Sequence, residues 1–287
     1  MKTPKGPPAN LNSLNKRIDN IAGGPGDNSV RLRRAIANAI VAQMLPAGGV
    51  AKGGAAMKFR VGEGRSRFSR DFDAARRAGM SVEDFIDAFE ELLAVGWNGV
   101  TSRIVPRTPS EPLNVPDEYI MRPFDLRLSY LGQAWMTVPF ELGHDEIGSA
   151  DEPTYVMDDE LADTIVALGF PRPEPVPVLA VEFQVAQKLH ACTTPERNGG
   201  NERAHDLVDL QILLDDEPLD PERLDDIGRR LFAARQVAPW PPVVQAWPGW
   251  DTAYVDAAQG LDVRPLDEAV AWANAVIAEA VATRHTG

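Results

Sequence analysis

The sequence has few of the residues that fix a fold through covalent bonds or metal ions. Of its 287 residues, only Cys192 is a cysteine and four are histidines. A single thiol excludes an internal disulfide, and so few Cys and His residues argue against a structural zinc site. No apolar run approaches the roughly 20 residues that cross a bilayer, and the start, Met1-Lys2-Thr3, lacks a signal-peptide apolar region. We therefore expect a soluble, cytoplasmic protein with no membrane partner.

Positive charge is also scarce over the whole chain, whose net charge is −13. Its distribution is uneven, however. Residues 1–80 contain fifteen Lys and Arg against five Asp and Glu, a net charge of +10, so the remainder carries −23. Because clustered positive charge attracts polyanions, the first 80 residues are the part expected to meet phosphate groups.

Two short stretches in this basic part have the composition of a phosphate-handling site. Gly53 and Gly54 form a turn at which a backbone can approach a phosphate closely. Asp71 and Asp73 lie on an extended run, where alternate side chains face the same way while Phe72 points into a core. Two carboxylates aimed at one point repel each other, and a shared Mg²⁺ relieves that repulsion. Such a site is typical of phosphoryl or nucleotidyl transfer.

Each stretch also has a simpler interpretation. An Asp-x-Asp pair after a strand is common as a solvated turn or a helix cap, and a Gly-Gly pair is often only a turn. Their order and proximity in the chain favour the catalytic interpretation, because short motifs gain specificity when they occur together.

Four motifs occur in order along residues 35–215. They are a glycine pair with a lysine four positions later, Ser-x-Asp-x-Asp, a lysine on an apolar helix, and Asp-x-x-Asp on the next helix. Their residues are Gly53, Gly54, Lys58, Ser69, Asp71, Asp73, Lys188, Asp206 and Asp209. This arrangement resembles the nucleotidyltransferase toxins of the AbiEii/AbiGii type, including the MenT-like branch, which are built on the DNA polymerase β-type nucleotidyltransferase fold.

The resemblance implies a Mg²⁺-dependent toxin that transfers a nucleotide from a nucleoside triphosphate, with a pyrimidine expected, to the 3′ acceptor end of tRNA. That reaction would block aminoacylation and translation, and a cognate antitoxin protein is the implied partner. The implied roles are as follows: Asp71 and Asp73 hold the metal, Gly53, Gly54 and Ser69 cradle the triphosphate, Lys58 and Lys188 neutralise its charge, and Asp209, or else Asp206, orients Lys188 or acts as a base.

The third metal ligand is the point at which the sequence departs from the family pattern. The resemblance leads us to expect an acid on a later strand. Asp125 is our candidate, because it lies in an expected strand over residues 121–130. Arg127, however, lies about where the acid is expected, and Glu141 is a weaker substitute.

The fold class expected is α/β (α+β), with a polymerase β-like nucleotidyltransferase core containing a mixed sheet and a mainly helical C-terminal lobe. The expected division is a mobile segment 1–28, a core lobe 29–170 and a helical lobe 171–287. We expect helices over 29–45, 82–94, 161–168, 180–191, 205–214, 221–237 and 266–283, and strands over 50–52, 100–105, 121–130 and 134–142. For residues 55–60 the alternation suggests a strand, whereas the resemblance implies a short helix, which we favour.

Several alternatives remain open at this point. Lys58 can be an ordinary surface lysine, and Lys188 can snorkel or form a structural ion pair with an aspartate of the next helix. The arginines at positions 31, 33 and 34 can form a solvated helix face or face RNA. The whole protein can instead modify a small molecule or a protein, or be an inactive binding member of the fold.

Overall fold

The computed structural model describes residues 6–108, 121–195 and 199–283. The chain divides into two compact units. The first consists of Met1–Gly64 and Phe68–Leu179, and the second of Arg65–Arg67 and Ala180–Gly287. The main division falls after Leu179, later than the expected boundary after residue 170, because the proline-rich stretch 171–177 leads into a strand of the first unit's sheet.

The N-terminal region differs from the mobile segment that we expected over residues 1–28. Helix α1 (Leu11–Ile21) begins at Asn10, whose side chain accepts a hydrogen bond from the Ser13 amide at 2.9 Å. Its Leu14 and Ile18 are completely buried. Four residues separate them, so they share one face of the helix and anchor it to the core of the first unit.

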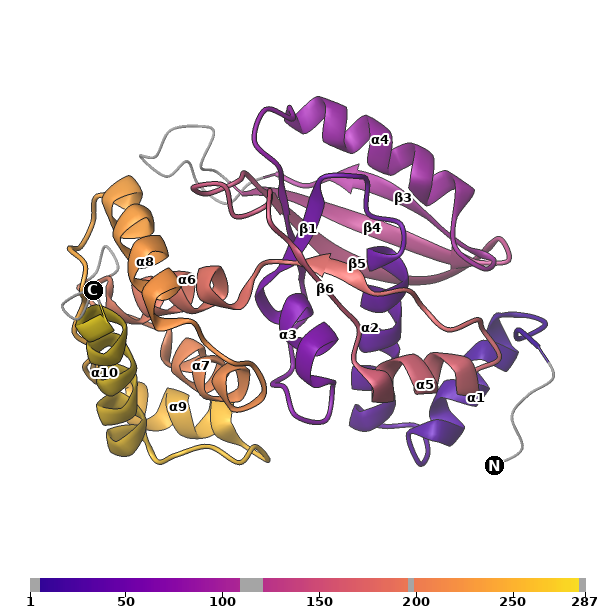
Figure 1. Cartoon of the computed structure of the whole chain (residues 1–287). Helices are drawn as coiled ribbons and strands as arrows, with labels where there is room; N and C mark the ends of the chain where they lie inside the picture. The colour runs from indigo at the N-terminus through magenta and orange to yellow at the C-terminus, as the bar shows by residue number, and fades with distance from the viewer. Residues whose placement is uncertain (1–5, 109–120, 196–198, 284–287) are drawn as a thin grey trace. The chain divides into compact units, whose positions relative to one another are not determined.

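A seven-stranded mixed sheet forms the centre of the first unit, with the order β3-β4-β5-β2-β1-β7-β6 (Figure 1). The strands are β1 (Gly49–Lys52), β2 (Phe72–Arg76), β3 (Val100–Pro106), β4 (Arg122–Tyr130), β5 (Gln133–Gly143), β6 (Thr154–Val156) and β7 (Val176–Val178). β2 pairs with β5 and β1 with β7 in parallel, and the other neighbours pair in antiparallel fashion. The expected mixed sheet is thus confirmed.

One face of this sheet is buried under helices. Phe72 and Phe140 are register partners on that face, and Phe59 of α3 (Gly53–Val61) packs on Phe72. Phe89 of α4 (Val82–Val95) packs on Phe140. Because both helices contact the same row of phenylalanines, α3 and α4 cover one side of the sheet. The long α2 (Asp27–Ala42) and α5 (Asp159–Ala167) also contribute to this core.

The alternate residues of β3, β4 and β5 point to the other face and are more exposed. The burial of β3 alternates along the strand, and Arg103 and Arg127 are exposed where their neighbours are buried. We call this side the open face. It carries charged residues and is the face toward which Asp73 points, since Phe72 points the other way.

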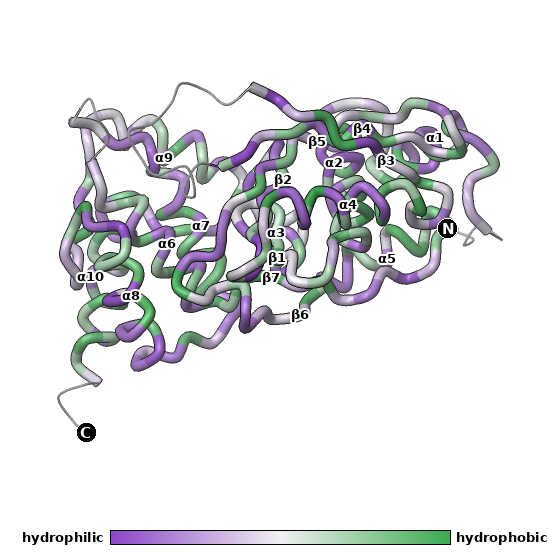
Figure 2. Tube along the Cα trace, turned by 90° about the horizontal axis from the view of Figure 1, so that it is seen from above, coloured by the Kyte–Doolittle hydropathy of each residue, from purple (hydrophilic) through white to green (hydrophobic). Residues whose placement is uncertain are grey.

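The second unit is helical over its described residues, as expected. It contains α6 (Val181–Thr193), α7 (Ala204–Asp216), α8 (Pro221–Arg235), α9 (Trp250–Ala258) and α10 (Leu266–Ala282). Within this unit α6 packs against α7 and α8, α7 against α9, and α10 against α7 and α8. In the described parts of the chain, no helix is long and apolar enough to cross a membrane, and helices such as α4 show hydrophilic as well as hydrophobic stretches (Figure 2).

Candidate functional site

The glycine pair sits where β1 ends and α3 begins, and it is in close contact with the Asp-x-Asp stretch. Gly53 has a φ of +59°, and a Cβ there would lie 2.1 Å from Asp73 Oδ2. A Cβ on Gly54 would lie 2.5 Å from Ser69 Oγ. A side chain at either position would therefore displace the residue opposite, and at Gly53 the positive φ adds backbone strain. The helix that we favoured over residues 55–60 is confirmed, so the free amides of its first turn lie beside this turn.

The two aspartates straddle the start of β2. Phe72 is completely buried and Asp73 is half-buried, so the alternation that we predicted holds from Phe72 onward. Asp71 is exposed and comes just before the strand, and Ser69 lies two residues earlier, outside any strand. The structure thus brings together Gly53, Gly54, Ser69 and Asp73, with Asp71 at the open end.

The strand register shows how far each of the two candidates for a third acid lies from Asp73. Glu141 lies directly opposite Asp73 on β5, one strand spacing of about 4.8 Å away. Asp125 is opposite Pro139, two residues further along and two strands from β2, about 12 Å away by the same spacings. Its carboxylate lies 3.7 Å from Arg107 Nε. Glu141 is therefore the better placed of the two, although Asp125 was our first candidate.

Lys58 lies on the buried side of α3. Its side chain is completely buried, and its ammonium is hydrogen-bonded to the Glu63 carboxylate and lies 5.5 Å from the centre of the Phe68 ring. It is thus no surface lysine. Through its bond to Glu63, Lys58 holds the loop between α3 and the Asp-x-Asp stretch.

Lys188 forms a buried ion-pair network within the second unit. Its Nζ donates to Asp206 Oδ1 at 2.9 Å and to Asp209 Oδ2 at 2.7 Å. Arg67 Nε donates to Asp209 at 2.9 Å, and Arg203 Nε to Asp206 at 2.6 Å. The three residues predicted from the last two motifs are therefore in direct contact. The ion pair that the sequence analysis left open therefore forms, and it involves both aspartates.

The network shifts the acidity of its members. Burial alone would raise the pKa of Asp206, but Lys188 and Arg203 overcome this effect and hold it below its usual range. Burial lowers the pKa of Lys188, and the two aspartates more than compensate, so it remains charged. Burial also lowers the pKa of the neighbouring His205 to about 4, so this imidazole is neutral at pH 7.

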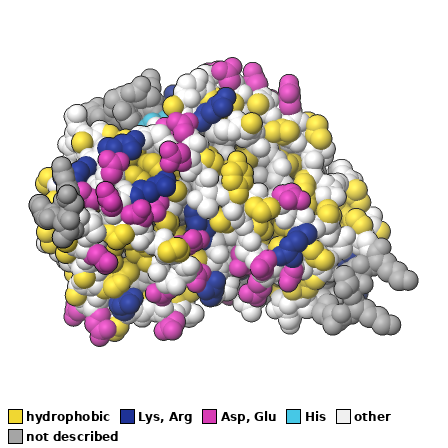
Figure 3. All heavy atoms as spheres, viewed as in Figure 1, with side chains coloured by type: hydrophobic (Ala, Val, Ile, Leu, Met, Phe, Trp, Pro, Cys, Tyr) yellow, Lys and Arg dark blue, Asp and Glu magenta, His cyan; other side chains and the backbone are white. Residues whose placement is uncertain are grey.

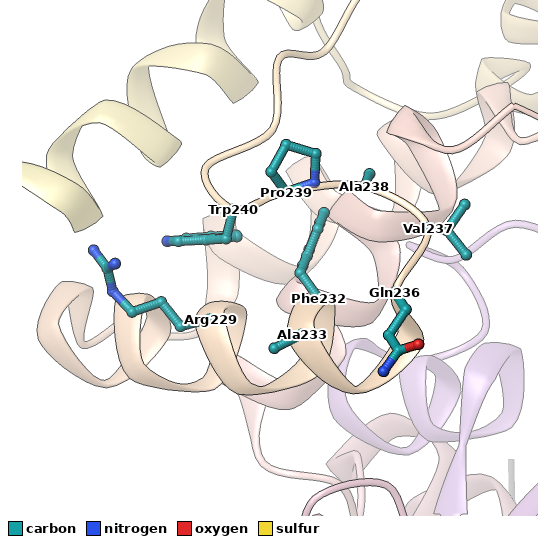
Figure 4. Close-up of a pocket in the computed structure, with 8 residues that line it drawn as sticks. All are labelled: Arg229, Phe232, Ala233, Gln236, Val237, Ala238, Pro239 and Trp240. Carbon is teal, nitrogen blue, oxygen red and sulfur yellow. The ribbon is translucent and has the colours of Figure 1, made fainter.

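A separate hollow of about 500 Å³ lies in the second unit beside α8 and the loop after it (Figure 4). In its wall, the rings of Phe232 and Trp240 pack edge to face, with their centroids 5.3 Å apart. Arg229 lines it but is bound to Asp225 through two hydrogen bonds. None of the residues predicted from the motifs lines this hollow, so it is not the site that they describe.

A sequence model of the family described as nucleotidyl transferase AbiEii toxins of type IV toxin–antitoxin systems matches residues 50–275, most of the chain. The chain belongs to this family. It is similar in structure to the nucleotidyltransferase toxin MenT4 of Mycobacterium tuberculosis, with a TM-score of 0.52 and 15% identity over 92% of this chain and 98% of that one. At that identity the likeness shows the fold alone, and it confirms the nucleotidyltransferase fold that we expected.

Two further comparisons add little to the AbiEii assignment. The polyadenylate synthase of Megavirus aligns with 71% of this chain and 35% of its own at 13% identity, but the TM-score of 0.36 is too low to support an argument. No curated protein matches the chain.

The AbiEii chain has a place that suits the expected Mg²⁺. Among its described residues, no three His, Cys, Asp or Glu side chains form a group that could hold a metal ion. Mg²⁺, however, is commonly held by one or two carboxylates together with substrate phosphates. Asp71 and Asp73 supply two carboxylates at the start of β2, and Gly53 has no side chain that would displace Asp73 Oδ2. The residues therefore fit this ion.

Arg34 is a residue near the site whose position the sequence did not distinguish from that of its neighbours. The three arginines of α2 separate in the structure: Arg31 pairs with Glu63 at 3.0 Å and Arg33 with Asp19 at 3.0 Å. Arg34 instead donates to the Thr137 carbonyl at 2.7 Å. Burial lowers its pKa, and the charge of Asp71 opposes that shift, so Arg34 lies in the field of the site.

Proposed function

We propose that this AbiEii chain transfers a nucleotide from a nucleoside triphosphate, with a pyrimidine expected, to the 3′ acceptor end of tRNA. The product could not be aminoacylated, and a cognate antitoxin would restrain the enzyme. The observation that carries the proposal is the fit of the diglycine turn against Asp73 and Ser69, in a chain of a nucleotidyltransferase toxin family.

The reaction is a displacement at phosphorus. A hydroxyl oxygen at the RNA 3′ end attacks the α-phosphorus, and the bond from this phosphorus to the oxygen that bridges to the β-phosphate breaks. Pyrophosphate leaves with that oxygen and its electron pair. The hydroxyl proton passes to Glu141, the carboxylate directly opposite Asp73 in the sheet. The enzyme acts chiefly through positioning and charge stabilisation.

The residues of the first unit divide the binding work. The amides at the start of α3, at Gly53 and Gly54, face the phosphates, where helix N-termini favour anions. The Ser69 hydroxyl donates a hydrogen bond to the same phosphates. Asp71 and Asp73 would hold Mg²⁺, which when bound neutralises phosphate charge and polarises the phosphoryl oxygens.

The two lysines have been assigned to neutralise the triphosphate, and this role remains a prediction. Lys58 already binds Glu63, and Lys188 binds Asp206 and Asp209. These bonds give each lysine a second role, because each one holds buried or half-buried carboxylates of its own unit in place. Of the roles predicted for Asp209 and Asp206, orienting Lys188 suits their burial better than acting as a base.

The test is an assay of the purified protein with purified tRNA and one labelled nucleoside triphosphate at a time. We expect label in tRNA from one pyrimidine triphosphate, lost on treatment with RNase and abolished by a metal chelator. Label confined to the protein or to small molecules would reject the tRNA acceptor. Growth arrest on expression should disappear with Asp71→Asn and Asp73→Asn, and arrest that persists in both would indicate a binding role without transfer.

A further inference from the structure

Two arginines face each other on the open face of the sheet. Arg103 on β3 and Arg127 on β4 are direct register partners in an antiparallel pair, and both are exposed. Side chains at such positions have Cβ atoms about 5 Å apart, and like charges directly opposite destabilise the sheet. The pair therefore lowers the stability of the sheet, so we expect these two residues to have a role other than stabilising the fold.

Among the described residues, the neighbours on this face do not neutralise the pair. Thr137, the partner of Arg127 on β5, is uncharged. Asp125 lies two positions along β4 but is engaged by Arg107 at 3.7 Å. Protection of a sheet edge by charge explains Arg103, since β3 is an edge strand. It does not explain Arg127, because β4 is paired on both sides.

The positive row continues from this pair toward the carboxylates. Pairing of β5 with β2 begins at Phe140, so the Thr137 carbonyl lies beyond it, and Arg34 donates to that carbonyl at 2.7 Å. Arg103 and Arg127 thus follow one another across β3 and β4, and Arg34, which comes from α2 on the covered side, reaches the unpaired edge of β5 at Thr137. Arg34 in turn lies in the field of Asp71 and Arg70.

The outer surface of α4 is acidic. α4 covers the buried face, and its outward positions Glu83, Asp84, Asp87, Glu90 and Glu91 are all exposed. Acidic side chains gather over this helix in the space-filling view (Figure 3). A polyanion is therefore repelled at the outer surface of α4.

We propose that Arg103, Arg127 and Arg34 bind backbone phosphates of the polynucleotide acceptor and lead its 3′ end to Asp71 and Asp73. The inference rests on the proposed function, for which it supplies the acceptor's binding surface. By strand spacings, Arg127 is about 16 Å from Asp73. At 3.4 Å per nucleotide of a helical strand, about five nucleotides span that distance.

The test compares Arg103→Gln/Arg127→Gln with Lys16→Gln/Arg77→Gln, which removes the same charge at two exposed positions of the first unit. Binding of a fluorescent single-stranded RNA of about 20 nucleotides, longer than typical single-strand sites, is measured over a range of salt. We expect the arginine variant to bind at least about tenfold more weakly, with the salt slope reduced by about 1.4 for two lost phosphate contacts. The matched control should stay near wild type. Arg103→Lys/Arg127→Lys should retain most binding, and the melting temperature of the Gln variant should equal or exceed that of wild type.

Transfer assays separate this inference from the proposed function. Transfer to the long RNA should fall in the arginine variant, whereas transfer to a trinucleotide, too short to reach Arg103 and Arg127, should not. If the wild type transfers nucleotides to RNA but the arginine variant and its control bind RNA equally well, the arginines are not the acceptor's binding surface and the proposed function still holds. If the arginine variant binds RNA more weakly but the wild type transfers no nucleotide to RNA, the proposed function is wrong and the arginines remain an RNA-binding surface. A wild type that binds no RNA would overturn the row as well.

Discussion

The chain contains two pairs of neighbouring aspartates that differ in almost every physical respect. Asp206 and Asp209 are each only 2% exposed and are held by Lys188, with Arg203 and Arg67 as further partners. The other pair lies at the start of a strand: Asp71 is exposed, and Asp73 is half-buried against the turn at Gly53. A buried carboxylate requires fixed cations, so the first pair is part of the fold. The second pair is the one to which we assign the substrate and its metal ion.

Removing Lys188 should have the largest effect. Lys188→Met leaves two buried carboxylates without their shared cation and should lower the free energy of unfolding by about 3–5 kcal/mol. Denaturant unfolding measures it, with the exposed Lys16→Met as the control. A loss below about 1 kcal/mol, the range of surface pairs, would show that the network contributes little.

Asp73→Asn should show the reverse pattern. We expect nucleotide transfer to fall about 10²–10³-fold, because a charge at the reacting phosphate is lost. Stability should change by no more than about 0.5 kcal/mol, as for most partly exposed sites. The rate is measured with saturating triphosphate, and Asp226→Asn, an exposed residue of an α8 ion pair, serves as the control. A folded Asp73→Asn protein with full activity would remove the distinction between the two pairs.

Gly53→Ala tests whether the turn is fitted to Asp73. The new methyl group would lie 2.1 Å from Asp73 Oδ2 at a φ of +59°, so we expect a loss of about 1–3 kcal/mol together with reduced transfer. Gly79→Ala is the matched control, since its φ is +78° but nothing lies within 4 Å of the added Cβ. Equal effects of the two substitutions would mean that backbone strain, and not the contact, matters.

The two candidates for a third acid give a smaller contrast. Glu141→Gln should slow transfer about 10²-fold, the lower end of what a general base contributes. Asp125→Asn should change it less than about twofold, because its carboxylate is about 12 Å from Asp73 by strand spacings. The reverse order of effects would restore Asp125 as the third acid.

The smallest effect is a pH dependence in the second unit. The pKa of His205 is lowered to about 4 by burial, whereas an unfolded histidine has a pKa of about 6.5. The folded state therefore binds fewer protons, and stability that is complete above about pH 6.5 falls as the pH drops toward 4. Melting temperatures of wild type and His205→Gln should diverge over this interval, and parallel curves would contradict the assignment.

Much of the fold could be predicted because its signals are local. The helix α10 and the strands β4 and β5 follow from periodicity and turn residues. For residues 55–60 the local alternation suggested a strand, and only the family resemblance implied the helix that forms there. The helix α1 was missed because the glycines and prolines around it suggested mobility, while only Leu14 and Ile18 mark its buried face. β7 was missed because Pro177 lies within it, in a strand of three residues.

The site was predictable where chemistry depends on neighbours in sequence. The contacts of Asp73 with Gly53 and of Lys188 with Asp206 and Asp209 were anticipated in kind. The position of Glu141 beside Asp73 depends on strand register, which the sequence does not reveal. The different partners of Arg31, Arg33 and Arg34 likewise depend on which elements surround α2, so three similar residues could not be told apart.

The short segment Arg65–Arg67 has a practical consequence for anyone who divides this protein. Because it belongs to the helical unit while the residues on both sides belong to the other, the chain passes between the units three times. A fragment that starts at Ala180 would therefore lack Arg67, and Asp209 would keep Lys188 but lose its second cation. A graft of the missing tripeptide, and not a simple truncation, is needed to reproduce the native helical unit.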